Sequence, residues 1–449
     1  MDKRTHETEI FDEAQADVRV EGMPSWANRE LKPVFAEDIK RSPGIDKPFL
    51  LITILLLLIG LIMMLSASFA SANIMTGEPL RLFQNQAIFA VSGVALMLIV
   101  SRVSVNFIRR CSLQVLIVSI ALLVLVLIIG IRINGATRWL GVGGEDDTLF
   151  SFQPSEITKL AVILAFARLA TRLGRKRMKT VKYGIIPFAA ITVTILILLY
   201  RQPHVSAMVI IGAVAAVMMF AGGTRIRYFL FGVVGAALLA AVVLLPTLIN
   251  SVRESGVQGI VQETSSPEFD FSGMGHWGRR IEIWLDPNAD PLGGGFQTRQ
   301  SLNAVGSGGW LGQGLGQSRQ KHHYLPEEHN DFIFAVIAEE LGFVGAMMIL
   351  SLFALLIVRG YWIAIHAVNR YSALIVIGIT SLLALQVFFN VAVVTNIIPA
   401  TGISLPMFSY GGTALWMQLI QMGIVLAVSR EIPLAKAEVY SDDEQEPKV

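Results

Sequence analysis

Charge is scarce in this sequence, and so is cysteine. Of its 449 residues only 16% are charged and 53% are apolar, and Cys111 is the single cysteine. A composition of this kind is unusual for a soluble domain, and one cysteine excludes an internal disulfide. The sequence also lacks a segment large enough for a cytoplasmic nucleotide-binding domain, so any reaction must draw its energy from the substrate. The net charge of +2 gives no indication of a nucleic acid partner.

Long apolar runs are what the sequence has instead. Residues 49–65, 112–131, 228–249 and 373–394 carry no charge, and each run is near the ~20 residues that a helix needs to cross ~30 Å of hydrocarbon. We expect an all-α polytopic membrane protein with ten transmembrane helices, at about 48–70, 84–100, 112–131, 153–170, 184–200, 205–222, 228–249, 331–358, 372–394 and 405–428. A disordered tail (1–47) would precede this membrane domain (48–430), and an acidic tail (431–449) would follow it.

Basic residues predict how the chain is oriented. The short loops of one side carry most of them, namely Arg102, Arg109, Arg110, seven residues between 168 and 182, Arg225, Arg227, Arg359 and Arg370. The short loops of the other side carry only Arg81, Arg132, Arg138 and Arg201. Because cytoplasmic loops are enriched in lysine and arginine, both termini are expected in the cytoplasm. The loop of about 250–330, between the seventh and eighth helices, is then extracytoplasmic.

This outer loop does not have the composition of a simple connector. Its tryptophans (Trp277, Trp284 and Trp310) predict packing, with short helices lying at the membrane interface. Nine glycines lie between 293 and 316, but no Gly-Lys-Ser or Gly-Lys-Thr follows them, which excludes a phosphate loop. The glycines either have a purely structural role or form tight turns that admit a bulky ligand. Histidines 322, 323 and 329 lie near Glu327 and Glu328, yet they lack the spacing of a zinc site and are interpreted as solvated interfacial residues.

Ionisable residues near the ends of spans are candidates for function, because each is costly inside a membrane. Glu156 and Lys159 are one helical turn apart. They form either a structural ion pair or a site where Lys159 meets an anion. Arg201 and His204 fall in a tight outer turn, where they either stabilise the turn or contact phosphate.

The stretch "LPEEHNDFIFAVIAEELG", residues 325–342, places acidic residues at the start of an apolar segment. Leu325-Pro326 fits a helix start, and helical periodicity then places Asp331, Ala335, Ala338 and Gly342 on one face. Asp331 is either a carboxylate stabilised by the helix dipole or a catalytic group. Glu339 and Glu340, deeper in the segment, are expected to form interhelical hydrogen bonds unless they serve the reaction.

Three motifs together resemble one family. They are "GQGLGQSRQKHHYLPEEHNDFIFAVIAEELGF", "NIIPATGISLPMFSYGGTALWMQLIQMGIVLAVSR" and "NGATRWL…FQPSEITKLA". In their order along the chain, in which the last of these comes first, they are similar to the SEDS family (shape, elongation, division and sporulation), the RodA/FtsW-type membrane glycosyltransferases that polymerise peptidoglycan from lipid II. The resemblance covers most of residues 48–430, and "GLGQSRQK" favours the FtsW/SpoVE branch.

The resemblance implies a fold of ten transmembrane helices with a large outer loop, and it implies that Asp331 is catalytic. Asp331 would take a proton from the attacking hydroxyl, and lipid II would be the substrate. The substrate-binding residues expected on this basis are Arg138, Lys159, Arg201, His204, Arg319, Lys321 and Glu339. A divalent cation, Mg or Mn, fits the pyrophosphate chemistry, and no nucleotide is needed. The expected partners are a class B penicillin-binding transpeptidase and other membrane proteins of the divisome or elongasome.

Some positions depart from the family pattern, and two other functions stay open. Asn330 stands where many members have threonine, "QPHVSA" replaces the commoner outer turn, and residues 145–147 are acidic. A lipid II flippase would need polar residues continuing to the cytoplasmic side, whereas most candidates here lie in the outer half. A non-catalytic division scaffold would make Asp331 dispensable.

Overall fold

The structure is a computed structural model, and it describes residues 44–133, 136–142, 150–229, 275–287, 290, 293–321 and 328–432. Residues 42–432 form one compact unit. Nearly all of both predicted tails lies outside the described residues, as does the span predicted at 228–249 from residue 230 onward.

Helices make up almost all of the described chain. The long ones are α2 (Lys47–Thr76), α3 (Arg81–Val100), α4 (Val105–Ile129), α5 (Pro154–Met178), α7 (Ile186–Arg201), α8 (Val205–Ala221), α12 (Ile333–Ile365), α13 (Arg370–Val394) and α14 (Gly412–Ser429). The shorter ones are α6 (Val181–Gly184), α10 (Gly275–Leu285) and α11 (Gly294–Ser307). The predicted helical class is therefore confirmed, and the two short helices expected in the outer loop are present as α10 and α11.

Seven helical segments in the described part of the chain are long and apolar enough to cross a membrane. They make this a multi-pass membrane protein, but they do not establish ten spans. Helix α8 is apolar but has only 17 residues. Helix α5 carries Glu156 and Lys159 near its start and three basic residues in its last turn, which lower its mean hydropathy. The remaining predicted span falls on residues that are not described.

A small sheet interrupts the helical pattern and was not predicted. Strands β1 (Ile131–Ile133), β2 (Ala136–Val142) and β3 (Phe150–Phe152) are antiparallel in the order β1-β2-β3. They connect α4 to α5, so that the sheet holds Arg138 of β2 next to the start of α5. The sheet is thus the element that positions one of the predicted cations.

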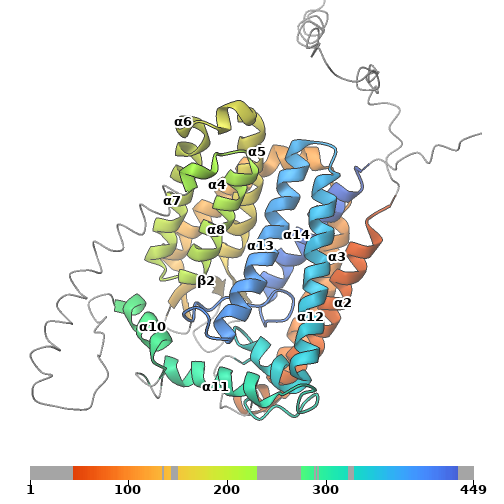
Figure 1. Cartoon of the computed structure of the whole chain (residues 1–449), viewed down its shortest axis with the longest axis vertical. Coiled ribbons are helices and arrows are strands. Elements are labelled where there is room, and N and C mark those ends of the chain that lie inside the picture. Colours follow the sequence, from red (N-terminus) through yellow and green to blue (C-terminus); the bar gives the residue numbers. More distant parts are fainter. Residues whose placement is uncertain are drawn as a thin grey trace, which may run out of the picture. The chain divides into compact units, whose positions relative to one another are not determined.

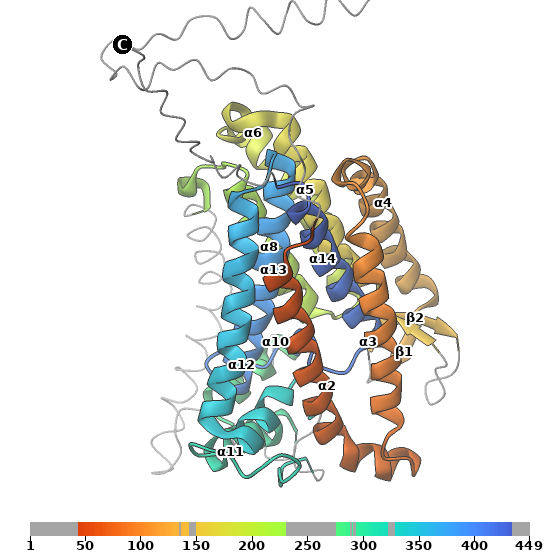
Figure 2. The same ribbon diagram turned by 90° about the vertical axis from the view of Figure 1, so that its right-hand side faces the viewer.

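Among the seven candidate spans, α13 and α14 are the most enclosed. Within the spanning window 67% of α13 and 78% of α14 is buried, against 22% of α3. Helix α14 packs against α3, and α12 packs against both α13 and α2. Helices α10 and α11 lie at one end of the bundle, here termed the loop end, and α6 lies at the other (Figure 1, Figure 2).

Helix α12 is broken at Gly342, whose φ of +66° lies in the left-handed region. The break frees backbone groups on both sides of it, and the preceding glycine-rich loop binds them. Gln313 N donates to Glu339 O (2.9 Å) and Gly314 N to Glu340 O (3.0 Å), while Phe343 N donates to Gly309 O (2.8 Å). Pairing of this kind is required where backbone leaves the helix at membrane depth.

The loop glycines are needed for this close approach. A Cβ on Gly308 would lie 2.0 Å from Ala338 O, and a Cβ on Gly312 would lie 2.1 Å from Glu340 O. Both distances are far below van der Waals contact, so no other residue fits at these two positions. Gly308 and Gly312 therefore have the structural role that was one of the two predicted roles of these glycines.

Candidate functional site

Asp331 lies in the turn that precedes α12, not on a helical face. The helix begins at Ile333 and is broken at Gly342, so the predicted common face of Asp331 with Ala335, Ala338 and Gly342 is wrong. The physical reason is that the chain enters the helix through a turn, where the 100° periodicity does not apply. The carboxylate is therefore freed from helical geometry and is positioned by neighbouring segments.

Those segments hold the backbone around Asp331 from two sides. Asn390 of α13 donates through Nδ2 to Asp331 O (2.8 Å) and to Ile403 O (2.7 Å). From the α13–α14 connection, Ser409 Oγ donates to Asn330 O (2.7 Å) and Tyr410 N donates to His329 O (2.9 Å). The Asp331 turn is thus joined to a connection that lies more than 70 residues further along the chain.

Gly402 supplies the wall against which the carboxylate lies. Its φ is +72°, and a Cβ at this position would be 3.0 Å from Asp331 Oδ2. A side chain there would be strained and would also press on the carboxylate. Glycine therefore allows the α13–α14 connection to approach Asp331 closely.

Two arginines from different elements interact electrostatically with Asp331. Arg138 of β2 donates through Nε to Gln202 O (3.4 Å) and through Nη2 to Pro203 O. Arg280 of α10 donates to Ala400 O, two residues from Gly402. Burial lowers the pKa of both guanidinium groups; Arg280 lowers that of Arg138 further, and the Asp331 carboxylate raises both. Two cations and one carboxylate therefore share a single electrostatic environment.

Arg280 was not among the residues predicted from the sequence. It stands in "RRIEIWLDP", where charged and apolar residues alternate and nothing sets it apart from Arg279. Its partner Ala400 is 120 residues away. The only available signal was that the "RRIEIW" stretch could form an amphipathic helix with one arginine directed inward.

Lys159 and Glu156 form the predicted ion pair. The distance from Lys159 Nζ to Glu156 Oε1 is 2.7 Å, and both side chains are buried at the start of α5. The predicted ion pair between these two side chains is therefore present in the structure. The ion pair does not exclude an additional contact of Lys159 with an anion. The positive charge of Lys159 still acts beyond Glu156, since it lowers the pKa of His204.

His204 is neutral in this setting. Burial, together with the smaller effects of the Arg138 and Lys159 charges, lowers its pKa from 6.5 to about 3. Its Nε2 atom lies 3.3 Å from Gln153 Nε2, and its Nδ1 atom is buried without a hydrogen-bond partner in the described part of the chain. Neutral imidazole with one unused nitrogen can hydrogen-bond a ligand, but it adds no positive charge.

Other buried polar atoms near these residues also have no partner among the described contacts. They are Ser155 Oγ, Asn390 Oδ1 and Thr401 Oγ1. Ser155 precedes Glu156, Asn390 binds the Asp331 backbone, and Thr401 lies between Ala400 and Gly402. Buried polar groups are usually paired, so this group of atoms indicates a place that a polar ligand completes.

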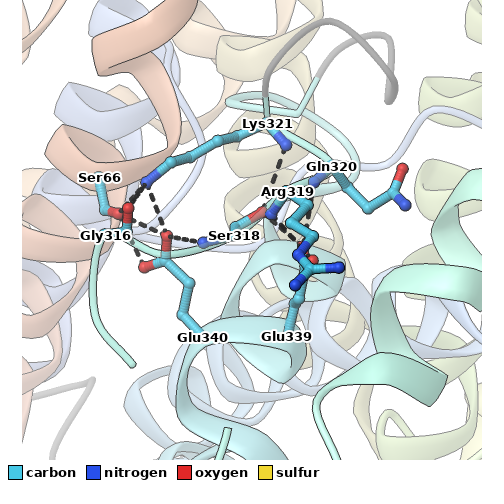
Figure 3. A network of polar contacts seen from close by, with 8 residues as sticks. All are labelled: Ser66, Gly316, Ser318, Arg319, Gln320, Lys321, Glu339 and Glu340. Atoms are coloured by element: carbon cyan, nitrogen blue, oxygen red, sulfur yellow. Dashed lines mark hydrogen bonds and ion pairs between the residues drawn. The ribbon is translucent and has the colours of Figure 1, made fainter. Parts of the chain in front are cut away.

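The remaining predicted residues are arranged differently. Arg201 is exposed at the end of α7, and no described contact joins it to Asp331. Lys321 is buried and paired with Glu340 at 3.0 Å (Figure 3). Arg319 is exposed, and its backbone N–H donates to Glu339 Oε1 (3.0 Å). Glu340 binds Ser66 of α2, as expected of an interhelical contact, whereas Glu339 binds loop residues.

In the described residues no group of three His, Cys, Asp or Glu side chains could hold a metal ion. His322, His323 and Glu327 lie outside the described residues. A carboxylate with surrounding arginines, a lysine and uncharged polar atoms is suited to an anionic substrate that must lose a proton nearby.

Comparison with known proteins agrees across nearly the whole chain. The family model described as "Cell cycle protein", which covers FtsW, RodA and SpoVE, matches residues 47–433. Stage V sporulation protein E of Bacillus subtilis (strain 168) is 40% identical over 394 residues, which cover 87% of this chain and 98% of that protein. The probable peptidoglycan glycosyltransferase FtsW of Trichlorobacter lovleyi is 36% identical over 392 residues, covering 87% of this chain and 94% of the relative.

Solved structures show the same fold. A chain of a peptidoglycan synthase complex, studied for the coordination of polymerization and crosslinking, is 26% identical with a TM-score of 0.68, covering 87% of this chain and 99% of its own. The rod shape determining protein RodA of Thermus thermophilus is 24% identical with a TM-score of 0.59, covering 87% and 98%.

Proposed function

The chain belongs to the SEDS family of FtsW, RodA and SpoVE, and from this we propose that it is a peptidoglycan glycosyltransferase that polymerises lipid II into glycan strands for division or sporulation. The observation that carries the proposal is the single carboxylate of Asp331 with Arg138 and Arg280 beside it. A glycosyl transfer from a lipid pyrophosphate needs one base and several cations, and these residues supply both.

Asp331 acts as the base in this proposal. It accepts the proton of the 4-hydroxyl of one lipid-linked disaccharide, and that oxygen forms a bond to the anomeric carbon of the second. The anomeric carbon–oxygen bond to pyrophosphate breaks at the same carbon, and undecaprenyl pyrophosphate leaves with the bonding electron pair. One base on the attacking side gives inversion, in contrast to the paired carboxylates of glycosidases.

Arg138, Arg280 and Lys159 are the groups that we assign to the pyrophosphate. Guanidinium groups bind phosphate oxygens with two parallel hydrogen bonds and stabilise the charge that develops on the leaving group. While they face Asp331 alone they favour its charged form. A pyrophosphate that draws them away would leave the carboxylate with a greater affinity for a proton at the moment of attack.

A divalent cation, Mg or Mn, would add charge neutralisation at the pyrophosphate. The fit is limited, because the described residues offer no three-ligand cluster. Mg²⁺ commonly takes phosphate oxygens and water with only one or two protein carboxylates, and Asp331 is the carboxylate within reach of such an ion. We therefore expect any metal to arrive with the substrate.

The loop end would face outward, with both termini in the cytoplasm. The support comes from the basic residues near the opposite end, such as Arg168, whose guanidinium binds the carbonyls of Arg109 and Arg110. Undecaprenyl-linked substrates would then reach Asp331 from the outer leaflet. The pyrophosphate bond supplies the energy, so the proposed reaction needs no nucleotide.

We also propose that the protein works with a class B penicillin-binding transpeptidase and other membrane proteins of the divisome or elongasome. The support is the similarity to a chain of a peptidoglycan synthase complex in which polymerization and crosslinking are coordinated. A transpeptidase that crosslinks the strands would consume the product of this reaction.

The test uses purified full-length protein with lipid II, a cognate transpeptidase and divalent cation, without nucleotide. Glycan strands resolved on a gel are the expected result. No strands, together with movement of fluorescent lipid II across liposome membranes, would assign the protein as a flippase. Neither activity, with the transpeptidase still recruited, would assign it as a scaffold.

A further inference from the structure

The first part of α12 is a separate short helix. The break at Gly342 divides Ile333–Leu341 from the long apolar part of α12, so the short piece is about 13 Å long at 1.5 Å per residue. Asp331 lies just before one end of it, and Glu339 and Glu340 lie at the other end. Because the break interrupts the helical backbone, the long part of α12 does not by itself fix the direction of the short part.

Glu340 is bound by three groups from two segments, the loop that precedes α12 and helix α2. Its carboxylate accepts from Lys321 Nζ (3.0 Å) and from Ser66 Oγ of α2 (2.7 Å), and Oε1 accepts from Ser318 N (3.3 Å) (Figure 3). It is 1% exposed, and Lys321 is 5% exposed. Lys321 Nζ also donates to Gly316 O (2.7 Å) and Ser66 Oγ (3.3 Å), so its three donors all have partners within the protein.

Glu339 is bound by the same loop but by no cation in the described contacts. Its carboxylate accepts from Ser318 Oγ (2.5 Å), Arg319 N (3.0 Å) and Gln320 N (3.4 Å). It is 1% exposed. We refer to Ser66, Ser318, Lys321, Glu339 and Glu340 as the clasp.

The clasp closes a loop of chain that contains Asp331. Ser318 and Glu339 are 21 residues apart, and Asp331 stands between them. We infer that the clasp residues Lys321, Glu339 and Glu340 are positioning residues, which fix the direction of the short helix and thereby the place of the Asp331 carboxylate. This inference rests on the proposed function, since it takes Asp331 as the base.

The inference gives Lys321 a different role from the one that the sequence suggested. A lysine that binds pyrophosphate must have a donor left for the substrate, whereas the three donors of Lys321 bind Glu340, Gly316 and Ser66. The described contacts of Lys159 include only Glu156. The two roles predict different kinetics. Loss of a substrate contact raises KM and is not repaired by changing Glu340, but loss of a positioning contact lowers kcat and is repaired when local charge balance returns.

The experiment compares Lys321→Met, Glu340→Gln and the double variant Lys321→Met/Glu340→Gln in full-length protein. Each single variant leaves one buried charge unpaired, whereas the double variant is again neutral. We expect each single variant to lower kcat ~10–100-fold with KM within ~3-fold of wild type, because small displacements of a base have effects of this size. The double variant should recover to within about 5-fold of wild-type kcat.

The Arg359–Asp46 pair is the matched control. It also joins α12 to the start of α2, at 2.7 Å, but near the opposite end of the bundle. Arg359→Met therefore removes a comparable contact between the same two helices without touching the clasp. It should leave kcat and KM close to wild type.

Two further measurements do not depend on turnover. In an Asp331→Asn background, binding of fluorescent lipid II should be unchanged by Lys321→Met. Hydrogen exchange of peptides that contain residues 328–331 should be several-fold faster in either single variant, and near wild type in the double variant and in Arg359→Met.

The inference is overturned if the double variant keeps a raised KM, if lipid II binding falls with Lys321→Met, or if exchange at 328–331 does not change. If Lys321→Met fails to fold, Glu340→Gln and the double variant give the same decision. Absence of glycan synthesis by the wild type would instead overturn the proposed function, while the exchange measurement would still report on the clasp.

Discussion

Two buried polar clusters lie at opposite ends of one short helix, and they differ in how completely their hydrogen bonds are formed. In the clasp, each carboxylate accepts from three groups, and the buried atom beside it that has no partner among the described contacts, Gln320 Oε1, belongs to neither carboxylate. Around Asp331, the atoms His204 Nδ1, Asn390 Oδ1 and Thr401 Oγ1 have no partner among the described contacts. A completed network holds a shape, and a network with unused donors and acceptors is one that a substrate completes.

The two clusters also differ in charge balance. Lys321 is matched by Glu340 in the clasp, and Lys159 by Glu156 at the start of α5. Among the described residues, Asp331 instead interacts electrostatically with both Arg138 and Arg280, which gives an excess of one positive charge over this group of three. This excess would be costly in a buried place without an anionic ligand, which supports a pyrophosphate there.

The largest effect should come from removing the base. Asp331→Asn keeps the shape of the side chain but cannot accept a proton at neutral pH, and a positioned base contributes ~10²–10⁴-fold in rate. We expect no detectable glycan strands on the gel, with normal expression and membrane insertion. A role limited to the helix dipole would cost only about 0.3–1 kcal/mol in stability and preserve turnover, so near-normal synthesis by this variant would remove the catalytic assignment.

The next largest effect should come from Arg280, the residue that the sequence analysis missed. Hydrogen bonds to charged groups contribute about 1.5–3 kcal/mol, so Arg280→Met should lower kcat/KM ~10–100-fold. Inhibition by inorganic pyrophosphate should weaken in parallel, which a role confined to holding Ala400 O would not produce.

Arg81, exposed at the start of α3 and at the same end of the bundle, gives the control. Arg81→Met should leave both kcat/KM and pyrophosphate inhibition unchanged. If Arg280→Met behaves in the same way as this control, the excess of positive charge has no part in the reaction.

A smaller effect should follow from the Lys159–Glu156 pair. Lys159→Met alone leaves Glu156 buried and unpaired, which destabilises by about 3–5 kcal/mol. The double variant Glu156→Gln/Lys159→Met avoids this penalty and isolates the substrate contact. We expect the double variant to fold normally and to show a KM for lipid II raised about 10-fold. Wild-type kinetics in the double variant would show that the pair is structural only.

The smallest effect should come from His204, and it should appear as stability. Its pKa is lowered from 6.5 to about 3 in the folded protein, so between these values the unfolded state binds more protons and stability falls as the pH decreases. The slope is at most about 1.4 kcal/mol per pH unit. Thermal unfolding in detergent between pH 7 and 5 should show this dependence in wild type and less of it in His204→Gln. Equal slopes would mean that His204 is not buried as a neutral group.

Seven of the ten predicted spans, and the family motif that contains Asp331, could be found from the sequence because both depend on local pattern. The length of an apolar run such as Arg370–Val394 can be counted directly in the sequence, without knowledge of tertiary contacts. Arg280 could not be found in this way, because its role depends on Ala400 at a distance of 120 residues. The pairing of Lys321 with Glu340 was missed for a related reason, since a loop residue gave no indication of being buried.

The sheet was missed because two of its three strands are too short to have a recognisable alternation. Strands β1 and β3 have three residues each. The position of Asp331 was predicted on a helical face because periodicity was extended through a turn that the sequence does not mark. In both cases the error lies at element boundaries, where tertiary contacts such as that from Asn390 decide the conformation.

The break at Gly342 has a consequence for how the protein is made. The backbone groups that bind Glu339 O, Glu340 O and Phe343 N belong to Gly309–Gly314, which is synthesised before α12. This loop must therefore be in place as α12 leaves the insertion machinery, or α12 would enter lipid with unpaired backbone groups. A substitution such as Gly312→Ala would then lower the yield of inserted protein. Most nascent chains would be retained and degraded, and the few molecules that reached the membrane would be fully assembled.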